Sequence, residues 1–404
     1  MPKTNGDRVL ADLKRLADFG RYKTGVHRPT YSPDDVASRQ WLAEQYAAAG
    51  LDVTIDGIGN VIGRNRNVAR SLLVGSHSET QPHGGWLDGA LGVVYGLELA
   101  RTLAGDPGIG VDTVAWADEE GHYGNMLGSR SFTESLSDAE IDSAASRDGK
   151  SLPDALAEAG YAGRKRELID PQRYLGYFEA HIEQGNTLET AGLRIGVVEA
   201  IIGAWNYWVT FTGEQNHAGT TQMRRRRDAG VAMVRLANRI HDRFAALSGP
   251  HTVWTIGRML LDPNAPSIVP GRAEMQVQFR DTDTTMLQRF EKALLELVYT
   301  SDRDGPCRCT VEPTSKSEPA AMDAGFCALI EAAAEQHAPK QHLRMPSGAG
   351  HDAQILSRRT RAAMMFVPSI RGVSHHWSED TKEEDIVLGA QVFADAATAM
   401  LRAG

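Results

Sequence analysis

The sequence of 404 residues predicts an α/β protein, a sandwich with a mixed, mostly parallel central sheet into which a smaller, ferredoxin-like α+β domain is inserted. Strands and helices alternate as far as Ala117, and the alternation resumes with a helix over residues 324–336 and a strand over 362–367. From about Ala204 the strands alternate polar and apolar residues, which is typical of strands with one exposed face. The second domain is therefore expected to interrupt the first.

The first domain is expected to comprise residues 1–205 and 318–404. Its first predicted helix has Ser32 as a suitable N-cap, Pro33 at the first helical position and Gly50 at its end. The other elements follow from the spacing of apolar residues. In chain order, this part is predicted to contain a helix over 32–50, strands over 51–55, 60–62 and 71–74, a helix over 89–103 and a strand over 111–117.

The inserted domain is expected to comprise residues 206–317. Its predicted elements are a strand over 205–212, a helix over 228–247, strands over 252–259 and 273–280, a helix over 285–299 and a strand over 308–312. The order strand, helix, strand, strand, helix, strand is that of a ferredoxin-like fold.

Composition limits the classes of function. The formal net charge is -9, which argues against nucleic acid or an anionic membrane as the partner. Three cysteines indicate a reduced protein without a disulfide framework. We find no run of about 18 apolar residues and no apolar core of a signal peptide in the charged first 21 residues, so a cytoplasmic protein is expected.

Histidine and carboxylate side chains follow several predicted strands. His77 ends one buried strand, and Asp88 lies in a glycine-rich loop that can fold back toward it. Glu119 and Glu120 follow another buried strand. Because neighbouring residues of an extended segment point to opposite sides, one carboxylate can hold a metal while the other moves protons. The alternative is a structural histidine and a solvated acidic turn.

Further along the chain, His181 lies at an expected strand end and His375 in a loop soon after the predicted strand over 362–367. Loop-borne sites of this kind suggest one convergent centre. Mixed imidazole and carboxylate ligands suit zinc, manganese, cobalt or nickel, and the lack of cysteine ligands argues against a structural zinc site.

Seven motifs occur in order over about residues 70–380: Gly75-Ser-His77, Gly84-Gly-Trp-Leu-Asp-Gly89, Asp118-Glu-Glu-Gly121, His181-Ile-Glu-Gln-Gly185, His217-Ala-Gly-Thr-Thr221, Ser347-Gly-Ala-Gly-His-Asp-Ala353 and Val373-Ser-His375. Together they resemble the M20 family of dinuclear metal hydrolases. Within it, the chain is most similar to the hydantoinase/carbamoylase branch, which contains N-carbamoyl-L-amino-acid hydrolases, allantoate amidohydrolases and β-ureidopropionases.

The resemblance implies two divalent ions per subunit. It implies that His77 and His181 bind separate ions, that Asp88 bridges both, and that Glu120 and His375 complete the ligand set. Glu119 would be the general base, taking the proton of a bridging water as hydroxide attacks the ureido or amide carbon.

Further roles implied by the resemblance concern the substrate. His217 would stabilise the oxyanion in the site of a neighbouring subunit, which makes the inserted domain a lid and dimerisation domain. Arg280 would bind the substrate carboxylate, although a surface ion pair is the alternative. Gln184 would lie near the ureido group. The backbone of Gly348, Ala349 and Gly350 would offer donors near the carboxylate.

Three departures from the family pattern bear on specificity. Glu79 stands where the family usually has Asp, a residue that orients the first histidine. Ser267 stands where it usually has a substrate-facing Asn. His376 and Trp377 replace a small residue and a proline, and His376 is an alternative ligand. These departures predict a functional hydrolase with a substrate other than the standard one.

The expected activity is metal-dependent hydrolysis of a linear carbon–nitrogen bond, N-carbamoyl, ureido or related amide, in a small carboxylate-bearing substrate. An M20-type aminoacylase or dipeptidase is the enzymatic alternative, and a non-catalytic binding protein on the same scaffold is the alternative of another class. The four arginines at 224–227 are interpreted as a solvated surface feature, with an anionic ligand or an inter-subunit contact as the alternatives.

Overall fold

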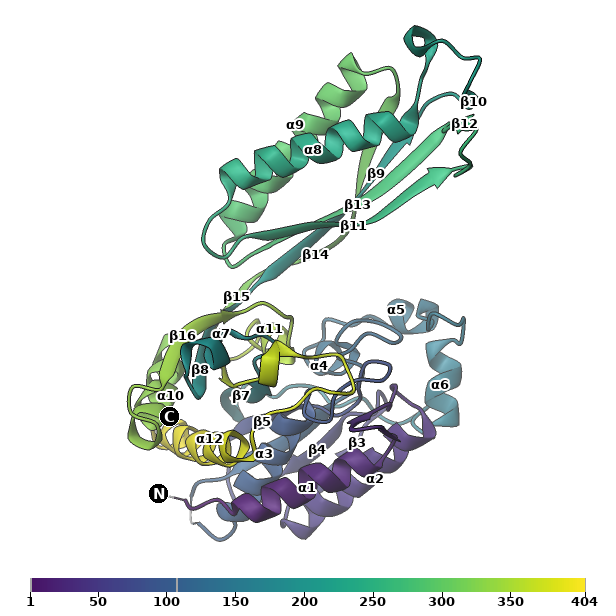
Figure 1. Cartoon of the computed structure of the whole chain (residues 1–404). Helices are drawn as coiled ribbons and strands as arrows, with labels where there is room; N and C mark the ends of the chain where they lie inside the picture. The colour runs from purple at the N-terminus through teal and green to yellow at the C-terminus, as the bar shows by residue number, and fades with distance from the viewer. Residues whose placement is uncertain (1, 107, 404) are drawn as a thin grey trace. The chain divides into compact units, whose positions relative to one another are not determined.

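The computed structural model describes residues 2–106 and 108–403, which form two compact units (Figure 1). The first unit contains the chain up to Glu199 and again from Ala321, and the second contains Ala200–Ala320. The prediction of a mixed α/β sheet with an inserted α+β unit is confirmed.

The first unit is built on one large sheet with the order β15-β8-β17-β7-β5-β6-β4-β3, and β16 pairs with β8. Strands β17, β7, β5 and β6 are mutually parallel, whereas β8 pairs with β17, β4 with β6 and β3 with β4 in the antiparallel direction. Its strands are β3 (Asp52–Ile55), β4 (Val61–Arg64), β5 (Ser71–His77), β6 (Val111–Trp116), β7 (Tyr174–Ile182), β8 (Ile195–Ile201), β15 (Ala320–Ala321), β16 (His342–Ser347) and β17 (Ala362–Val367); a small hairpin joins β1 (Arg21–Tyr22) and β2 (Gly25–Val26).

Helices pack against this sheet, and α3 and α12 contact its parallel strands. The helices of this unit are α1 (Gly6–Asp18), α2 (Pro33–Ala48), α3 (Ala90–Thr102), α4 (Leu127–Phe132), α5 (Asp138–Ser143), α6 (Leu152–Glu158), α7 (Thr187–Ala191), α10 (Ala324–His337), α11 (Asp352–Leu356) and α12 (Glu383–Ala403), with a 3-10 turn at Ile370–Gly372. Helix α2 begins as predicted, because Ser32 Oγ accepts a hydrogen bond from Asp35 N at 3.3 Å and Pro33 follows the cap. Helix α1 was not predicted, although Val9, Leu13 and Leu16 form its buried face.

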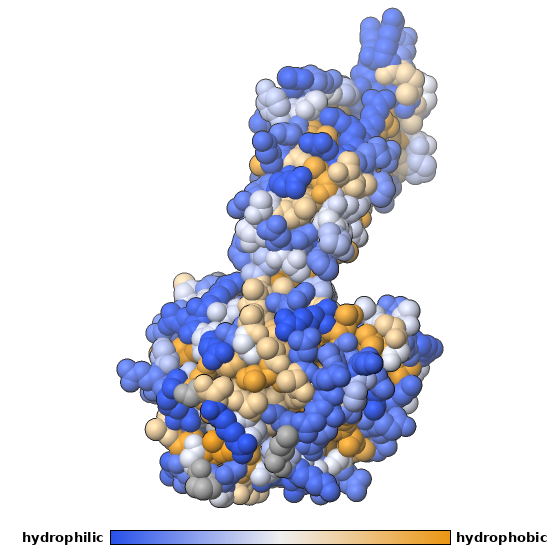
Figure 2. Space-filling view, turned by 90° about the vertical axis from the view of Figure 1, so that its left-hand side faces the viewer, coloured by the Kyte–Doolittle hydropathy of each residue, from blue (hydrophilic) through white to orange (hydrophobic). Residues whose placement is uncertain are grey.

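Among the described residues, α12 alone is long and apolar enough to cross a membrane by length and composition. In this structure 67% of its most apolar stretch is buried, as is usual for a core helix. The face of the molecule seen in Figure 2 is mostly hydrophilic, with smaller hydrophobic patches.

The second unit is a four-stranded antiparallel sheet with two helices, in the predicted chain order. Its sheet order is β11-β13-β9-β14, and alternate residues of β9 are buried. Trp205, Tyr207, Val209 and Phe211 form the sheet side of a core shared with the two helices. The elements are β9 (Gly203–Thr212), β10 (Asn216–His217), a 3-10 turn at Met223–Arg225, α8 (Ala229–Leu247), β11 (Val253–Asp262), β12 (Ile268–Val269), β13 (Arg272–Asp281), α9 (Thr284–Asp304) and β14 (Arg308–Ser317).

Strand β14 runs five residues beyond the predicted end at Glu312, through Pro313. A proline is tolerated here because β14 is an edge strand, and the register shifts between Pro313 and Ser315.

Candidate metal centre

Two histidines meet where neighbouring parallel strands end. Val74 of β5 pairs with Phe178 of β7, and continuing this register by three residues places His77 beside His181. Their ring centroids are 5.9 Å apart, and both side chains are buried. The carboxyl ends of these strands therefore lie on the edge of the sheet where α/β proteins usually carry their chemistry.

Asp88 lies between the histidines and the loop that follows β17. Its Oδ1 is 3.0 Å from His181 Nε2 and 3.6 Å from His77 Nε2. Its Oδ2 is 3.3 Å from His375 Nε2, which lies 3.7 Å from Glu120 Oε2. The two oxygens of this buried carboxylate thus face two separate sets of potential metal ligands.

The donors form two groups that share Asp88, one with His77 and His181 and one with Glu120 and His375. In each group the potential ligand atoms lie within 4.8 Å of one another, a spacing suited to a metal ion. The implied arrangement of His77 and His181 on separate ions is not what this grouping shows, because adjacent strand ends bring both imidazoles to the same oxygen of Asp88.

The loop that carries Asp88 depends on a glycine. Gly89 has φ +65°, and a Cβ atom there would lie 2.5 Å from three atoms of the His77 ring. Any other side chain would displace the imidazole, so this glycine allows the close approach of loop and ligand.

Glu119 and Glu120, which follow β6, have different neighbours. Glu120 receives hydrogen bonds from Gln81 N at 3.2 Å and from Gln81 Nε2 at 2.9 Å, and it belongs to the His375 group. Glu119 belongs to neither group, and its Oε2 lies 3.7 Å from His77 Nε2. Glu120 thus lies among the candidate metal ligands, and Glu119 lies beside them.

Burial and like charges change the pKa values of these groups. Burial, together with the charges of Glu120, Asp352 and Asp88, raises the pKa of Glu119 well above its usual value despite the opposing effect of His77. The hydrogen bond to Asp88 raises the pKa of His375 to about 9 against the effect of burial, with help from Glu120. Divalent cations bound here would offset the negative charge of the clustered carboxylates and take the place of these protons.

Glu79 lies in a buried chain of charges rather than directly against the imidazole. His77 Nδ1 is 3.1 Å from the backbone oxygen of Glu79, whereas the nearest carboxylate oxygen is 3.8 Å away. The carboxylate instead accepts from Glu119 N at 2.6 Å and from Arg39 Nη2 at 2.7 Å. Arg39 also binds Asp35 at 2.9 Å. The residue predicted to orient His77 through its carboxylate therefore also fixes the backbone of Glu119.

Of the predicted substrate contacts, Gln184 lies in this centre. Its Nε2 is 3.2 Å from Asp88 Oδ2, 3.1 Å from Ser374 Oγ and 3.3 Å from His375 Nε2. In the segment of Gly348, Ala349 and Gly350, the N–H of Ala349 donates to Ser347 Oγ at 3.1 Å. Gln184 thus supports Asp88 and His375 in addition to any substrate contact.

Two buried acidic residues, Asp352 within a motif and Glu379 four residues after His375, were missed as parts of the site. Buried Glu379 accepts hydrogen bonds from Leu87 N at 3.3 Å and from Asp88 N at 3.1 Å, so it anchors the loop of Asp88. Burial raises the pKa of Glu379 to about 8, and the charge of Asp88 adds to this effect. Asp352, fully buried, influences Glu119 through its charge. The available signal was that Asp352 directly follows His351 and that Glu379 lies three residues after His376.

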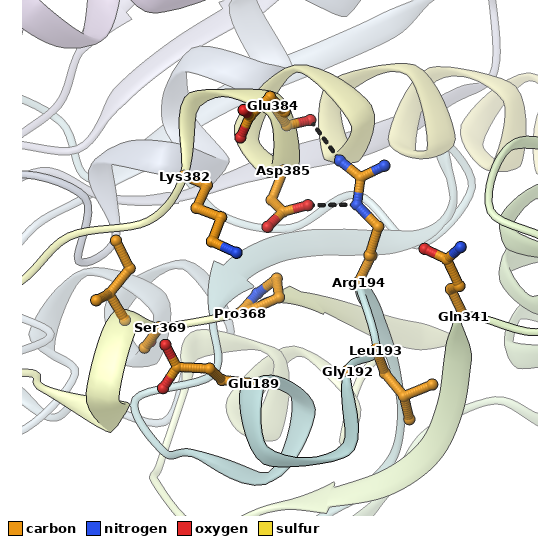
Figure 3. Close-up of a pocket in the computed structure, with 11 residues that line it drawn as sticks. Glu189, Gly192, Leu193, Arg194, Gln341, Pro368, Ser369, Lys382, Glu384 and Asp385 are labelled. Carbon is orange, nitrogen blue, oxygen red and sulfur yellow. Dashed lines mark hydrogen bonds and ion pairs between the residues drawn. The ribbon is translucent and has the colours of Figure 1, made fainter.

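A separate pocket of about 410 Å³ lies at the base of the loop that carries His375 (Figure 3). Arg194 contacts Glu384 and Asp385 in its wall. Ser369 also lines the pocket, and its Oγ accepts from Gln184 N at 3.0 Å. The pocket therefore lies next to Gln184, which contacts Asp88 and His375, but none of the candidate metal ligands lines it.

The remaining predicted residues belong to the second unit. His217 in β10 is exposed, and its Nδ1 accepts hydrogen bonds from Gly219 N at 2.9 Å and Thr220 N at 3.2 Å. An accepting Nδ1 leaves the proton of a neutral imidazole on Nε2, so Nε2 is a donor. The backbone oxygen of Ser267 accepts from Ala218 N at 3.0 Å, which places Ser267 beside this segment.

Arg280 in β13 is half-buried, and burial lowers its pKa. Its Nε donates to Gln278 Oε1 at 2.8 Å, a contact within one face of the strand. Arg280, His217 and Ser267 thus all belong to the second unit.

The fold and the clustered imidazole and carboxylate side chains are those of an α/β protein suited to bind metal ions. The model of Peptidase family M20/M25/M40 matches residues 73–399. The chain belongs to this family, which confirms the resemblance drawn from the motifs.

Two relatives that match nearly the whole chain are amidohydrolases. The chain is 32% identical over 391 residues to allantoate amidohydrolase of Escherichia coli (strain K12), covering 95% of each chain. It is 33% identical over 411 residues to the N-carbamoyl-L-amino acid amidohydrolase of Geobacillus stearothermophilus, covering 96% of each. A crystal structure of an amidase of the hydantoinase/carbamoylase family from Burkholderia phymatum is 44% identical with a TM-score of 0.92, covering 100% of this chain and 99% of that chain.

Proposed function

We propose that this protein hydrolyses a linear carbon–nitrogen bond, of the N-carbamoyl, ureido or related amide kind, in a small substrate that carries a carboxylate. The observation that supports this most directly is Asp88, whose two oxygens face two groups of donors at the carboxyl ends of parallel strands. Relatives that match nearly the whole chain are amidohydrolases of this kind.

We propose two divalent ions per subunit, with His77 and His181 holding one, Glu120 and His375 the other, and Asp88 both. Zinc, manganese, cobalt and nickel all suit this mixture of imidazole and carboxylate donors. When bound, such ions would polarise the scissile carbonyl and lower the pKa of the attacking water. The cluster contains three carboxylates and three imidazoles, which is enough side chains of suitable type to bind two such ions.

Glu119 is proposed as the group that moves protons. It stands outside both ligand groups, and its Oε2 faces His77. The raised pKa caused by burial and neighbouring carboxylates favours proton uptake at this oxygen. Glu119 would accept the proton of the attacking water and donate it to the departing nitrogen.

The residues proposed to bind substrate come from both units. Arg280 would bind the substrate carboxylate, for which a planar guanidinium is suited. Gln184, the backbone at Gly348, Ala349 and Gly350, and the shortened Ser267 would set which substrate fits. His217 would donate its Nε2 proton to the oxyanion, consistent with its accepting Nδ1.

A homodimer is proposed, and the second unit offers an edge for it. Strand β11 lies at the edge of its sheet, and Met259, Leu260 and Leu261 are exposed there. An apolar edge strand invites pairing with a second copy, whereas the opposite edge, β14, carries a proline and a register shift. We propose a cytoplasmic enzyme, in keeping with the free cysteines.

The test is a substrate panel assayed with the enzyme reconstituted separately with zinc, manganese, cobalt and nickel. N-carbamoyl amino acids and ureido acids should be hydrolysed with release of ammonia, whereas dipeptides and N-acyl amino acids should be poor substrates. Faster hydrolysis of dipeptides or N-acyl amino acids would favour an aminoacylase or peptidase. Tight binding without any hydrolysis would favour a binding protein.

A further inference from the structure

A pocket of about 440 Å³ lies in the second unit, between the first half of α8, the last turn of α9 and the 3-10 turn at Met223–Arg225. Four arginines and two hydroxyl groups contribute to its wall, namely Arg224, Arg226, Arg235, Arg239, Thr300 and Ser301. In a chain with a formal charge of -9, this is an unusual concentration of guanidinium groups.

Four arginines and two carboxylates, Asp228 and Asp304, line this pocket, so its formal charge remains positive at +2. Asp228 Oδ1 caps α8 by accepting from Val231 N at 3.0 Å. The carboxylate of Asp304 is bound by both sides of the Arg303 guanidinium, at 2.7 and 2.8 Å. Each carboxylate therefore already has a partner outside the set of pocket arginines.

The arginines on α8, by contrast, have donors to spare. Within the described residues Arg235 makes no hydrogen bond or ion pair, and Arg239 makes one long hydrogen bond, from Nη1 to Ser301 Oγ at 3.4 Å. They are one helical turn apart on α8, so their guanidinium groups can approach the same ligand. Paired guanidinium forks suit an oxyanion that accepts several hydrogen bonds.

The pocket wall is also joined to the segment that carries His217. Arg226 donates from Nε to Thr221 O at 3.1 Å and from Nη2 to Ala218 O. Arg227 donates from Nε to Pro306 O at 2.9 Å, and Pro306 lines the pocket from the other side. The interpretation of this arginine run as a purely solvated feature is therefore too simple, because two of its members hold backbone oxygens.

We propose that this pocket binds a small oxyanion with at least two negative charges, of the phosphate or polycarboxylate type, and that the bound anion restrains residues 217–221 through Arg226. Binding to this pocket does not depend on the proposed hydrolytic function. Its failure and the failure of that function are therefore measured separately.

The first test compares anion binding to the metal-loaded protein and to two double variants by isothermal titration calorimetry. The pocket variant is Arg235→Ala/Arg239→Ala. The control, Arg243→Ala/Arg289→Ala, also removes two arginines, one from α8 and one from α9, and both are exposed and outside the pocket. Pyrophosphate and citrate serve as probes of the two chemistries at 150 mM NaCl, where weak attraction between exposed charges is largely screened.

Wild type and control should bind one more molecule of at least one probe per chain than the pocket variant, or bind it about tenfold more tightly, as expected for the loss of charge-assisted hydrogen bonds. Preference for pyrophosphate would assign a phosphate ligand, and preference for citrate a polycarboxylate. Binding of both probes that is equal in all three proteins would overturn the proposal, because any anion bound at the metal centre is common to them. No binding to wild type would overturn it as well.

The second test measures hydrogen exchange in peptides that cover residues 216–227. The preferred anion should slow exchange there in wild type and control, and it should have no effect on the pocket variant. Anion binding that leaves this exchange unchanged in wild type would overturn the proposed link to the His217 segment.

Discussion

The backbone N–H of Glu119 donates a 2.6 Å hydrogen bond to Oε1 of Glu79, while Oε2 of Glu79 accepts from Arg39 at 2.7 Å. Arg39 and Glu79 are both fully buried. Glu79, which holds the backbone of the proposed proton carrier Glu119, is therefore itself fixed by a buried ion pair with Arg39. The position of Glu119 thus depends on contacts in the protein core.

Glu79→Gln should destabilise the protein by about 3 kcal/mol, because it leaves the buried Arg39 with Asp35 as its one remaining carboxylate partner. The midpoint of urea unfolding measures this change. Glu383→Gln breaks an exposed pair with Lys14 and should cost less than about 1 kcal/mol. Equal midpoints for the two variants would contradict a structural role for Glu79.

Glu119→Gln should keep the metal content of the wild type and lower kcat by about 10²- to 10⁴-fold, the usual contribution of a general acid or base. Metal content is measured by elemental analysis alongside turnover of the best substrate from the panel. Glu44→Gln, on the exposed face of α2, is the control and should behave as wild type. Turnover near the wild-type rate in Glu119→Gln would disprove the assignment.

Metal stoichiometry should follow the two donor groups. His77→Ala and His375→Ala should each lose one ion, whereas Asp88→Ala should lose both, because its oxygens face both groups. Native mass spectrometry counts the ions directly. Loss of the same single ion from all three variants would show one shared site instead of two.

Metal affinity of the His375 group should rise with pH up to about 9, the pKa of His375 in the metal-free protein. Below this pH the imidazole carries a proton, and only the neutral form can coordinate, so binding at pH 7 must release that proton. Competition with a chelator between pH 6.5 and 9.5 measures the slope.

His375→Asn should bind with a slope smaller by about one proton, and His376→Ala, beside it but outside both groups, should keep the wild-type slope. An unchanged slope in His375→Asn would refute the linkage.

His217 should act in the site of the partner subunit. His217→Ala and Glu119→Gln homodimers should both be nearly inactive, yet exchanging their subunits should restore about a quarter of wild-type activity, since half the dimers are mixed and each holds one complete site. The mixture of His217→Ala with a His217→Ala/Glu119→Gln double variant is the control and should stay inactive.

Failure of the first mixture to regain activity would place His217 in its own subunit or outside catalysis.

Charging the β11 edge with Met259→Lys/Leu261→Lys should give monomers in light scattering, and these monomers should lack activity.

Much of the fold was accessible from local patterns. The alternating burial of β9 and β13 and the capping of α2 by Ser32 follow from periodicity and cap chemistry, which depend on residues close in sequence. Helix α12 was missed because its residues are buried almost all round, so no amphipathic stripe marks it.

The sequence by itself determined the chemistry of this protein. The motifs contain His77, Asp88, Glu120, His181 and His375, at predicted strand ends or in the loops that follow strands, and their side chains are imidazoles and carboxylates whatever the packing. The tertiary structure decided the partners: that both histidines of β5 and β7 face one oxygen of Asp88, and that Glu79 holds Glu119. The physical reason is that strand order and loop closure, which join residues up to three hundred positions apart, set these contacts, and no local pattern encodes them.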